Sequence, residues 1–368
     1  MNVWDTVRNG VFVIAEIGKG FIQTPDDRPV AEYLDNAKKL ARAAKEAGVD
    51  AVKFQTHIVE DEQVNVEVVS PHFKGSDRYS WVQRNMRATP LEDFWIPLKR
   101  YCTEIGIPFF STPMSRASAR LLSTLDVPLW KVGSGDMLDF VLLEYLASSG
   151  RPIILSTGMS TLEEVDKAVD FLQKRKASLA ILHCVSKYPC PPEELHLASI
   201  KFLRERYGVP TGFSDHSIGI DSALAAVALG ATVIEKHFSF DRALWGSDHK
   251  VSMTPDEMTK LVTEIRALEK DWGKRSEFLA KEIVHKGMGE PAKSMNADEA
   301  IFRPYFRKTL TAGQDLPAGT VLTSEMIYAM RPQIALNGFP SESLEYVVGK
   351  RINQTLIKYQ PLTEELFE

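Results

Sequence analysis

The fold is decided by three consecutive segments of the sequence: VFVIAEI (residues 11–17), AEYLDNAKKLARAAKEAG (residues 31–48) and AVKFQT (residues 51–56). The first and third are short and rich in Val, Ile or Phe, which is typical of buried strands. The middle segment stops at Gly48 and places its apolar side chains on one helical stripe: Leu34, Ala37, Leu40, Ala41 and Ala44. A strand, a helix and a strand in this order predict a βαβ unit in a parallel sheet.

The same alternation continues through the first three-quarters of the chain. Six further strand-like segments follow: IPFFST (residues 107–112), PLWKVGS (128–134), PIILST (152–157), LAILHC (179–184), VPTGFSD (209–215) and TVIEKHF (232–238). The last of them precedes a helix predicted from residue 255 to about residue 271. Eight strands, each followed by a helix, predict an α/β fold of the closed (β/α)8 type, the TIM barrel. An open doubly wound sheet is the alternative, but its Gly-rich first turn is replaced here by Glu16, Ile17 and Gly18.

The rest of the chain predicts further divisions. A long polar stretch at residues 57–90 precedes the next helix. Residues 273–302 are polar and lack periodicity, so we expect a linker between a catalytic barrel at residues 1–272 and a tail at residues 303–368. The tail combines short strand-like segments with a Pro-Ala-Gly turn, which predicts a small β-rich domain. A domain of this size is marginal alone, so we expect it to dock against another surface.

Composition excludes several classes of protein. The 368 residues are 44% hydrophobic and 25% charged, as expected of a globular protein with a full core. A net charge of −5 argues against a nucleic-acid partner held by overall charge, and no apolar run suits a membrane helix. Three cysteines and an N-terminus without signal-peptide character indicate a cytoplasmic protein without a disulfide scaffold.

In a (β/α)8 barrel, catalytic groups lie at the C-terminal ends of the strands. Five predicted strand ends carry cations and hydroxyls that suit a phosphate or carboxylate: Lys53, Lys131, Ser134, Ser156 and Ser214. Two lysines on neighbouring parallel strands repel each other unless an anion lies between them. The alternative is that each lysine pairs with an interior carboxylate such as Glu16 or Asp136.

A second set lies on two adjacent strands. His216 and His237, beside Glu235 and Asp215, suit a divalent metal with open coordination positions, although a rim histidine can instead be a hydrogen-bonded structural residue. An anion cradle beside such a metal indicates a reaction between a phosphorylated or carboxylated donor and a carbonyl. Glu16 could then act as general base. Cys184 and Cys190 are interpreted as packing residues.

These residues lie in motifs that resemble the sialic acid synthases, a family that includes legionaminic and pseudaminic acid synthases. The motifs, in chain order, are IAEIG (residues 14–18), AVKFQTHIVEDE (51–62), FFSTPMS (109–115), WKVGSGD (130–136), IILSTGM (153–159), HCVSKYP (183–189), GFSDHS (212–217), EKHF (235–238) and GSDHKVSM (246–253). The tail resembles the antifreeze-like, or SAF, domain (a β-clip fold) that follows the barrel in that family.

The resemblance implies condensation of phosphoenolpyruvate with an open-chain N-acylmannosamine-type sugar, giving a nine-carbon 2-keto acid and phosphate. It implies that His216 and His237 hold a divalent metal, usually Mn²⁺ with Mg²⁺ or Co²⁺ as alternatives, and that Glu16 activates water. The residues that it assigns to phosphoenolpyruvate are Lys53, Lys131, Ser134, Ser156, Ser214 and Ser186, the last where the family more often has Asn. Those that it assigns to the sugar are Gln55, Tyr188, Asp248 and Arg307. Arg307, in FRKTL, would reach a partner's active site in a domain-swapped homodimer.

Two departures from the family concern the substrate. Lys19, Gly20 and Phe21 stand where the family usually has Asn-His, and Trp245 and Ser247 stand where prolines are common. The rival enzyme class is another phosphoenolpyruvate-dependent synthase that makes a 3-deoxy acid from another aldose or a sugar phosphate. A non-catalytic carbohydrate-binding barrel is the alternative from a different class.

Overall fold

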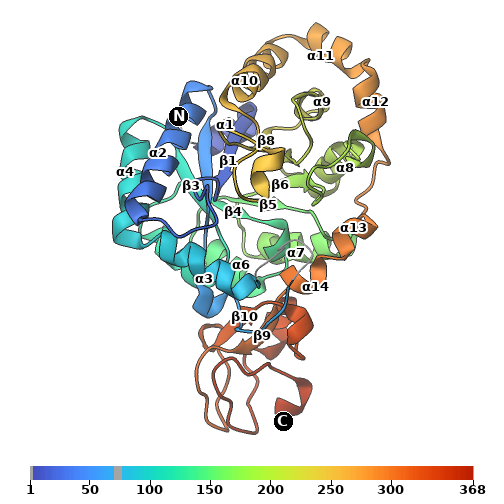
Figure 1. Cartoon of the computed structure of the whole chain (residues 1–368). Helices are drawn as coiled ribbons and strands as arrows, with labels where there is room; N and C mark the ends of the chain where they lie inside the picture. Colours follow the sequence, from blue (N-terminus) through green and yellow to red (C-terminus); the bar gives the residue numbers. More distant parts are fainter. Residues whose placement is uncertain (1–2, 70–76, 368) are drawn as a thin grey trace.

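The computed structural model describes residues 3–69 and 77–367, and its centre is one parallel sheet of eight strands (Figure 1). The strands are β1 (Phe12–Gly18), β2 (Ala51–Thr56), β3 (Phe109–Pro113), β4 (Trp130–Val132), β5 (Ile153–Ser156), β6 (Leu179–Cys184), β7 (Thr211–Asp215) and β8 (Val233–His237). Their order is β3-β2-β1-β8-β7-β6-β5-β4, and β3 also packs against β4. The predicted strand number and the barrel-like α/β fold are confirmed.

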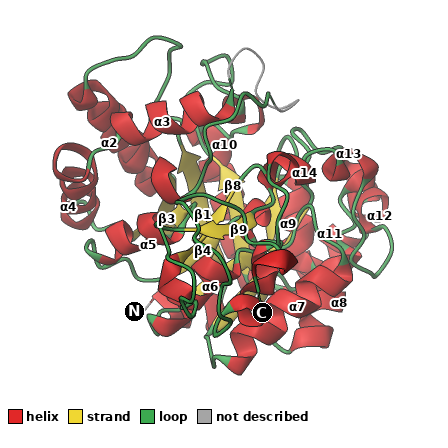
Figure 2. Ribbon diagram, turned by 90° about the horizontal axis from the view of Figure 1, so that it is seen from below, coloured by secondary structure: helices red, strands yellow, loops and turns green. Residues whose placement is uncertain are grey.

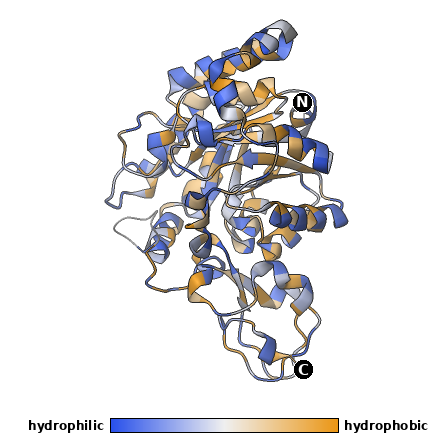
Figure 3. Cartoon of the chain, turned by 90° about the vertical axis from the view of Figure 1, so that its right-hand side faces the viewer, coloured by the Kyte–Doolittle hydropathy of each residue, from blue (hydrophilic) through white to orange (hydrophobic). Residues whose placement is uncertain are grey.

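Helices surround the strands as a ring (Figure 2). They are α1 (Val3–Asn9), α2 (Val30–Glu46), α3 (Arg78–Ala88), α4 (Ile96–Glu104), α5 (Arg116–Ser123), α6 (Phe140–Ser148), α7 (Leu162–Lys174), α8 (Ala198–Tyr207), α9 (Asp221–Ala228) and α10 (Pro255–Lys270). Along these helices hydrophobic and hydrophilic residues alternate (Figure 3), as expected of helices that bury one face. Helix α3 lies inside the stretch interpreted as polar, residues 57–90, of which residues 70–76 lie outside the described part.

The register of the sheet brings the functional candidates together. Every residue of β1 is buried, and β1 lies between β2 and β8. Glu16 on β1 is paired in register with Lys53 on β2 and with His237 on β8. Because parallel strands end on the same side of the sheet, three side chains that are far apart in the sequence meet at one rim.

Residues 273–302, expected to be a linker without regular structure, form short helices instead. These are α11 (Trp272–Leu279), α12 (Glu282–Met288) and α13 (Ala297–Ala300). Helix α12 buries Val284 and Gly287, and the Gly287 carbonyl accepts a hydrogen bond of 2.8 Å from the Leu197 amide. Helices that bury so few side chains leave no visible hydrophobic period, which explains why the sequence pattern did not predict them.

The tail begins with α14 (Arg303–Phe306) and contains β9 (Thr309–Ala312), paired antiparallel with β10 (Ile327–Met330), and α15 (Leu344–Val347). The predicted short strands and turns are present. Fully buried leucines and isoleucines give the tail a core of its own: Leu310, Ile327, Ile352, Leu356 and Leu362.

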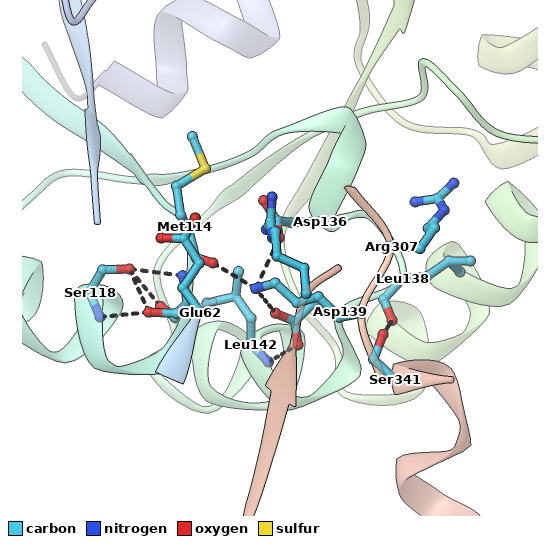
Figure 4. Close-up of polar contacts among 12 residues, drawn as sticks. Glu62, Met114, Ser118, Asp136, Leu138, Asp139, Leu142, Arg307 and Ser341 are labelled. Carbon is cyan, nitrogen blue, oxygen red and sulfur yellow. Dashed lines mark hydrogen bonds and ion pairs between the residues drawn. The ribbon is translucent and has the colours of Figure 1, made fainter. Parts of the chain in front are cut away.

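The tail lies against the end of the barrel where the strands finish (Figure 1). Lys308 donates to Asp139 at 2.7 Å and to the Met114 carbonyl at 2.6 Å, and Ser341 donates to the Leu138 carbonyl (Figure 4). Arg331 forms a buried ion pair with Asp136. The tail therefore closes the rim that carries the candidate site. No helix in the described part of the chain combines the length and apolar character needed to cross a membrane.

Candidate active site

A cavity of about 190 Å³ opens between the strand ends and the tail. It is lined by twelve of the thirteen residues predicted for the site: Glu16, Lys53, Gln55, Lys131, Ser134, Ser156, Ser186, Tyr188, Ser214, His216, His237 and Asp248. The fold therefore brings together side chains from every part of the barrel sequence.

The two buried lysines share carboxylates of the barrel interior. Lys53 lies 2.5 Å from Glu16, and Glu235 lies 3.6 Å from Lys53 and 3.7 Å from Lys131. Lys131 also donates to the Ser156 hydroxyl at 2.7 Å. The prediction that the lysines stand on neighbouring strands is wrong, because β3 lies between β2 and β4. The interior pairing that was the alternative is present.

Glu16 has the properties of a general base. Its Oε1 accepts a hydrogen bond of 2.8 Å from Gln55. Burial, opposed by the charge of Lys53 and reinforced by that of Glu235, raises the pKa of Glu16 to about 7. A carboxyl group that titrates near neutral pH can both accept and return a proton during turnover.

Hydroxyls and a glycine form a small cradle beside Lys131. The Ser134 hydroxyl accepts a hydrogen bond of 3.0 Å from the Gly158 amide. A Cβ atom at Gly158 would lie 2.3 Å from the Ser186 hydroxyl and 2.7 Å from that of Ser134. The close approach of backbone and hydroxyls therefore requires glycine.

The sequence analysis did not predict one residue that holds the loops of this cradle in place. Glu299, on α13, is buried and accepts hydrogen bonds from the amides of Met159 at 2.9 Å and Ser186 at 2.8 Å. It thereby joins the loops after β5 and β6. The sequence signal was limited to Asn296 and Glu299 as a capping box, which predicts a helix start and nothing about the site.

The two histidines face each other at the rim, with ring centroids 5.6 Å apart. The Nδ1 of His216 lies 2.8 Å from the Val185 carbonyl and donates to it, which leaves Nε2 as an acceptor. Burial lowers the pKa of His237 to about 4, so this imidazole is neutral at pH 7. Tyr188 lies over His216, with centroids 4.0 Å apart.

These histidines fit a divalent cation as two imidazole ligands with open positions beside them. Within residues 3–69 and 77–367, no group of three or more His, Cys, Asp and Glu side chains has the arrangement of a metal site. Asp215, expected beside the pair, instead forms a fully buried ion pair with Lys236 at 2.7 Å. It points away from the cavity because neighbouring residues of a strand face opposite sides.

The expected reach of Arg307 into a partner's active site stays a prediction, and within the single chain its contacts are as follows. It is buried and donates to the carbonyls of Ser134 and Met159 and to the hydroxyl of Ser160, all in its own chain. It does not line the cavity. The side chains of the tail that do are Phe306 and Arg331, which sequence reasoning missed because only docking brings them to the barrel.

The fold and this cavity define a class of protein: a barrel with a cavity rich in charged side chains at its rim and a tail that closes it. Comparison with known families then places the chain within that class. The model of the NeuB family matches residues 40–277, and that of the SAF domain matches residues 307–368. The chain belongs to the NeuB family.

Individual relatives agree with this assignment. The chain is 36% identical over 332 residues to N,N'-diacetyllegionaminic acid synthase of Legionella pneumophila, covering 88% of this chain and 87% of that protein. It is 30% identical to human N-acetylneuraminate-9-phosphate synthase, covering 99% and 95%. The crystal structure of the Bacillus subtilis spore coat polysaccharide biosynthesis protein spsE is similar, with a TM-score of 0.77, 31% identity and coverage of 98% and 95%. The chain is therefore an enzyme, a transferase of the sialic acid synthase type.

Proposed function

We propose that the enzyme condenses phosphoenolpyruvate with an open-chain N-acylmannosamine-type sugar. The observation that carries the proposal is the meeting of Lys131, the Ser134–Gly158 cradle, Glu16 and the histidine pair in one cavity. A new bond joins C3 of phosphoenolpyruvate to the aldehyde carbon, and the aldehyde oxygen takes up a proton. Water adds at C2, and inorganic phosphate leaves. The product is a nine-carbon 2-keto sugar acid.

Different residues of the cavity bind the two substrates. Lys53, Lys131 and the hydroxyls of Ser134, Ser156, Ser186 and Ser214 bind phosphoenolpyruvate. Gln55, Tyr188 and Asp248 bind the sugar. Glu16 accepts the proton of the attacking water, and a pKa near 7 suits this role.

His216 and His237 would hold the divalent cation, which we expect to be Mn²⁺. Bound there, it would polarise the aldehyde oxygen of the sugar. The neutral state of His237 keeps its lone pair available at neutral pH.

We also propose that the working unit is a domain-swapped homodimer, in which each tail closes the barrel of the other subunit. Swapping exchanges identical elements, so the contacts of Lys308, Arg331 and Ser341 with a barrel are the same in either arrangement. The proposal is supported by the small size of the tail, which depends on the barrel for much of its burial.

The test is His237→Ala, assayed with phosphoenolpyruvate, N-acetylmannosamine or its derivatives, and Mn²⁺. We expect loss of bound Mn²⁺ and loss of turnover by at least about 100-fold, with an unchanged circular dichroism spectrum. His285→Ala, on the distant helix α12, is the matched control. A His237→Ala variant with wild-type turnover would refute the proposed role, and sugar binding without phosphate release by the wild type would refute the reaction.

A further inference from the structure

A second group of cations lines the outer wall of the cavity, away from the cradle. Lys19 follows β1, Arg78 begins α3, and Arg331 follows β10 in the tail. The wall is built from three segments that are far apart in the sequence.

Lys19 is held in place by its own loop. Gly18 before it has a φ of +53°, and the Lys19 carbonyl accepts a hydrogen bond of 2.9 Å from Ile22. Phe21 is fully buried and packs against Phe54 and Phe94, with ring centroids 6.2 and 4.9 Å apart. The loop therefore presents Lys19 to the cavity from an anchored position.

The ammonium group of Lys19 is buried without an acceptor. Among the described residues, its Nζ has no hydrogen-bond partner. It lies 3.5 Å from the centre of the Trp81 ring, which covers one side of the cation. Burial and the charge of Arg78 lower the pKa of Lys19 well below its usual range. An ammonium with unused donors beside another cation is a site that an anion would stabilise.

Two carboxylates of this wall and its support, those of Glu62 and Asp136, are already paired with other side chains. Glu62 lies 3.3 Å from Arg78 and 2.6 Å from His57, whose pKa burial lowers to about 4. Asp136 pairs with Arg331 and lies 3.0 Å from Lys308.

Within the described residues, three cations of this wall and its support are therefore ion-paired, namely Arg78, Arg331 and Lys308, with the carboxylates of Glu62, Asp136 and Asp139. Lys19 is the cation of the wall whose Nζ has no hydrogen-bond acceptor.

The position of the wall indicates which substrate carries the missing anion. Phosphoenolpyruvate has its own cations and hydroxyls on the cradle side. Lys19 instead lies within range of the charge of Asp248, which is assigned to the sugar. We propose that Lys19, with Arg78 and Arg331, binds a phosphate group on the sugar, at the end of its carbon chain remote from the aldehyde. This inference rests on the proposed function and names the substrate class within it.

The experiment compares N-acetylmannosamine with N-acetylmannosamine 6-phosphate, in the presence of Mn²⁺. The two sugars are supplied in separate assays, and turnover is followed by the loss of phosphoenolpyruvate absorbance. We expect the wild type to prefer the phosphorylated sugar in kcat/KM by at least about tenfold, the worth of one charge-assisted hydrogen bond. Lys19→Met should reduce this preference to near unity, and Lys19→Arg should retain most of it. Lys39→Met, at an exposed lysine of α2, should leave the preference unchanged.

Two results would overturn the inference. One is equal or better use of the neutral sugar by the wild type, which would leave the proposed function intact. The other is an unchanged preference in Lys19→Met. If neither sugar is turned over, the proposed function fails instead, and calorimetry then decides the inference. Tighter binding of the 6-phosphate to the wild type than to Lys19→Met supports it, and equal binding refutes it.

Discussion

At the scale of single residues, the most informative feature is the carboxyl group of Glu16, which is buried between Lys53 and Gln55. Its pKa of about 7 lies above the usual value because burial disfavours the charged form more than Lys53 favours it. If Glu16 is the base, only the ionised form is active. Turnover of the wild type should therefore rise with pH through about 7 and fall as the carboxyl group becomes protonated below it.

The corresponding variant is Glu16→Gln, which keeps the shape and the contact with Gln55. We expect kcat to fall by about 10²- to 10⁴-fold, the usual worth of a general base, with binding of phosphoenolpyruvate retained. Steady-state kinetics check the fall in kcat, and a direct binding titration checks that phosphoenolpyruvate still binds. Activity within twofold of the wild type, with an unchanged pH profile, would show that Glu16 is a structural partner of Lys53.

A second prediction at this scale concerns Gly158. In Gly158→Ala, the new Cβ would meet the hydroxyls of Ser186 and Ser134 at 2.3 and 2.7 Å and displace them from the cradle. Affinity for phosphoenolpyruvate should fall by at least about tenfold, the worth of one or two lost hydrogen bonds to a charged group. Gly133→Ala is the control, because it lines the same cavity and its Cβ would find its nearest neighbour, a methyl group of Thr112, at 3.8 Å. Equal binding by both variants would refute the cradle.

At the scale of elements, the eight barrel strands could be predicted because each is a short apolar run bounded by turn signals. The side chains at their ends could be predicted for the same reason, since the fold alone sends strand ends to one rim. The elements that could not be predicted are helices that bury few hydrophobic side chains. Helix α1 buries Val7, and α12 buries Val284 and Gly287. Helix α3 begins in a polar segment where its cap, Asp77, is the main signal.

Helix α13 shows how such an element can still matter to the site. Glu299 accepts from two backbone amides that belong to the loops of the proposed phosphoenolpyruvate site, at Met159 and Ser186. We infer that it is a positioning residue. Glu299→Gln removes the charge from both hydrogen bonds, and we expect KM for phosphoenolpyruvate to rise by about tenfold while kcat changes less.

The matched control is the neighbouring residue. Asp298→Asn removes the same charge from α13, but Asp298 is exposed and pairs with Lys187 at 2.9 Å. It should leave both constants near their wild-type values. A Glu299→Gln variant that loses kcat and stability together, without a specific rise in KM, would indicate a purely structural role.

At the scale of the whole molecule, the sequence did not predict how the tail contacts the barrel. Its fold could be predicted from its turns and short strands, but its contacts could not, because Lys308, Arg331 and Ser341 meet the barrel through docking and not through any local pattern. Within the single chain, the guanidinium of Arg307 donates to the carbonyls of Ser134 and Met159, and its reach into a partner's active site stays a prediction. In this position it still couples the tail to the proposed phosphoenolpyruvate site.

Whether each tail serves its own barrel or its partner's can be decided by complementation. One chain carries Glu16→Gln, which disables the barrel, and the other carries Arg307→Ala, which disables the tail. In a swapped dimer, one site of the mixed pair combines the intact barrel of the second chain with the intact tail of the first. Dimers purified through two different tags should then show about half of the wild-type activity, since one of two sites is intact. If each tail closes its own barrel, every site contains one defect, and the mixed pair is no more active than the two variants measured separately.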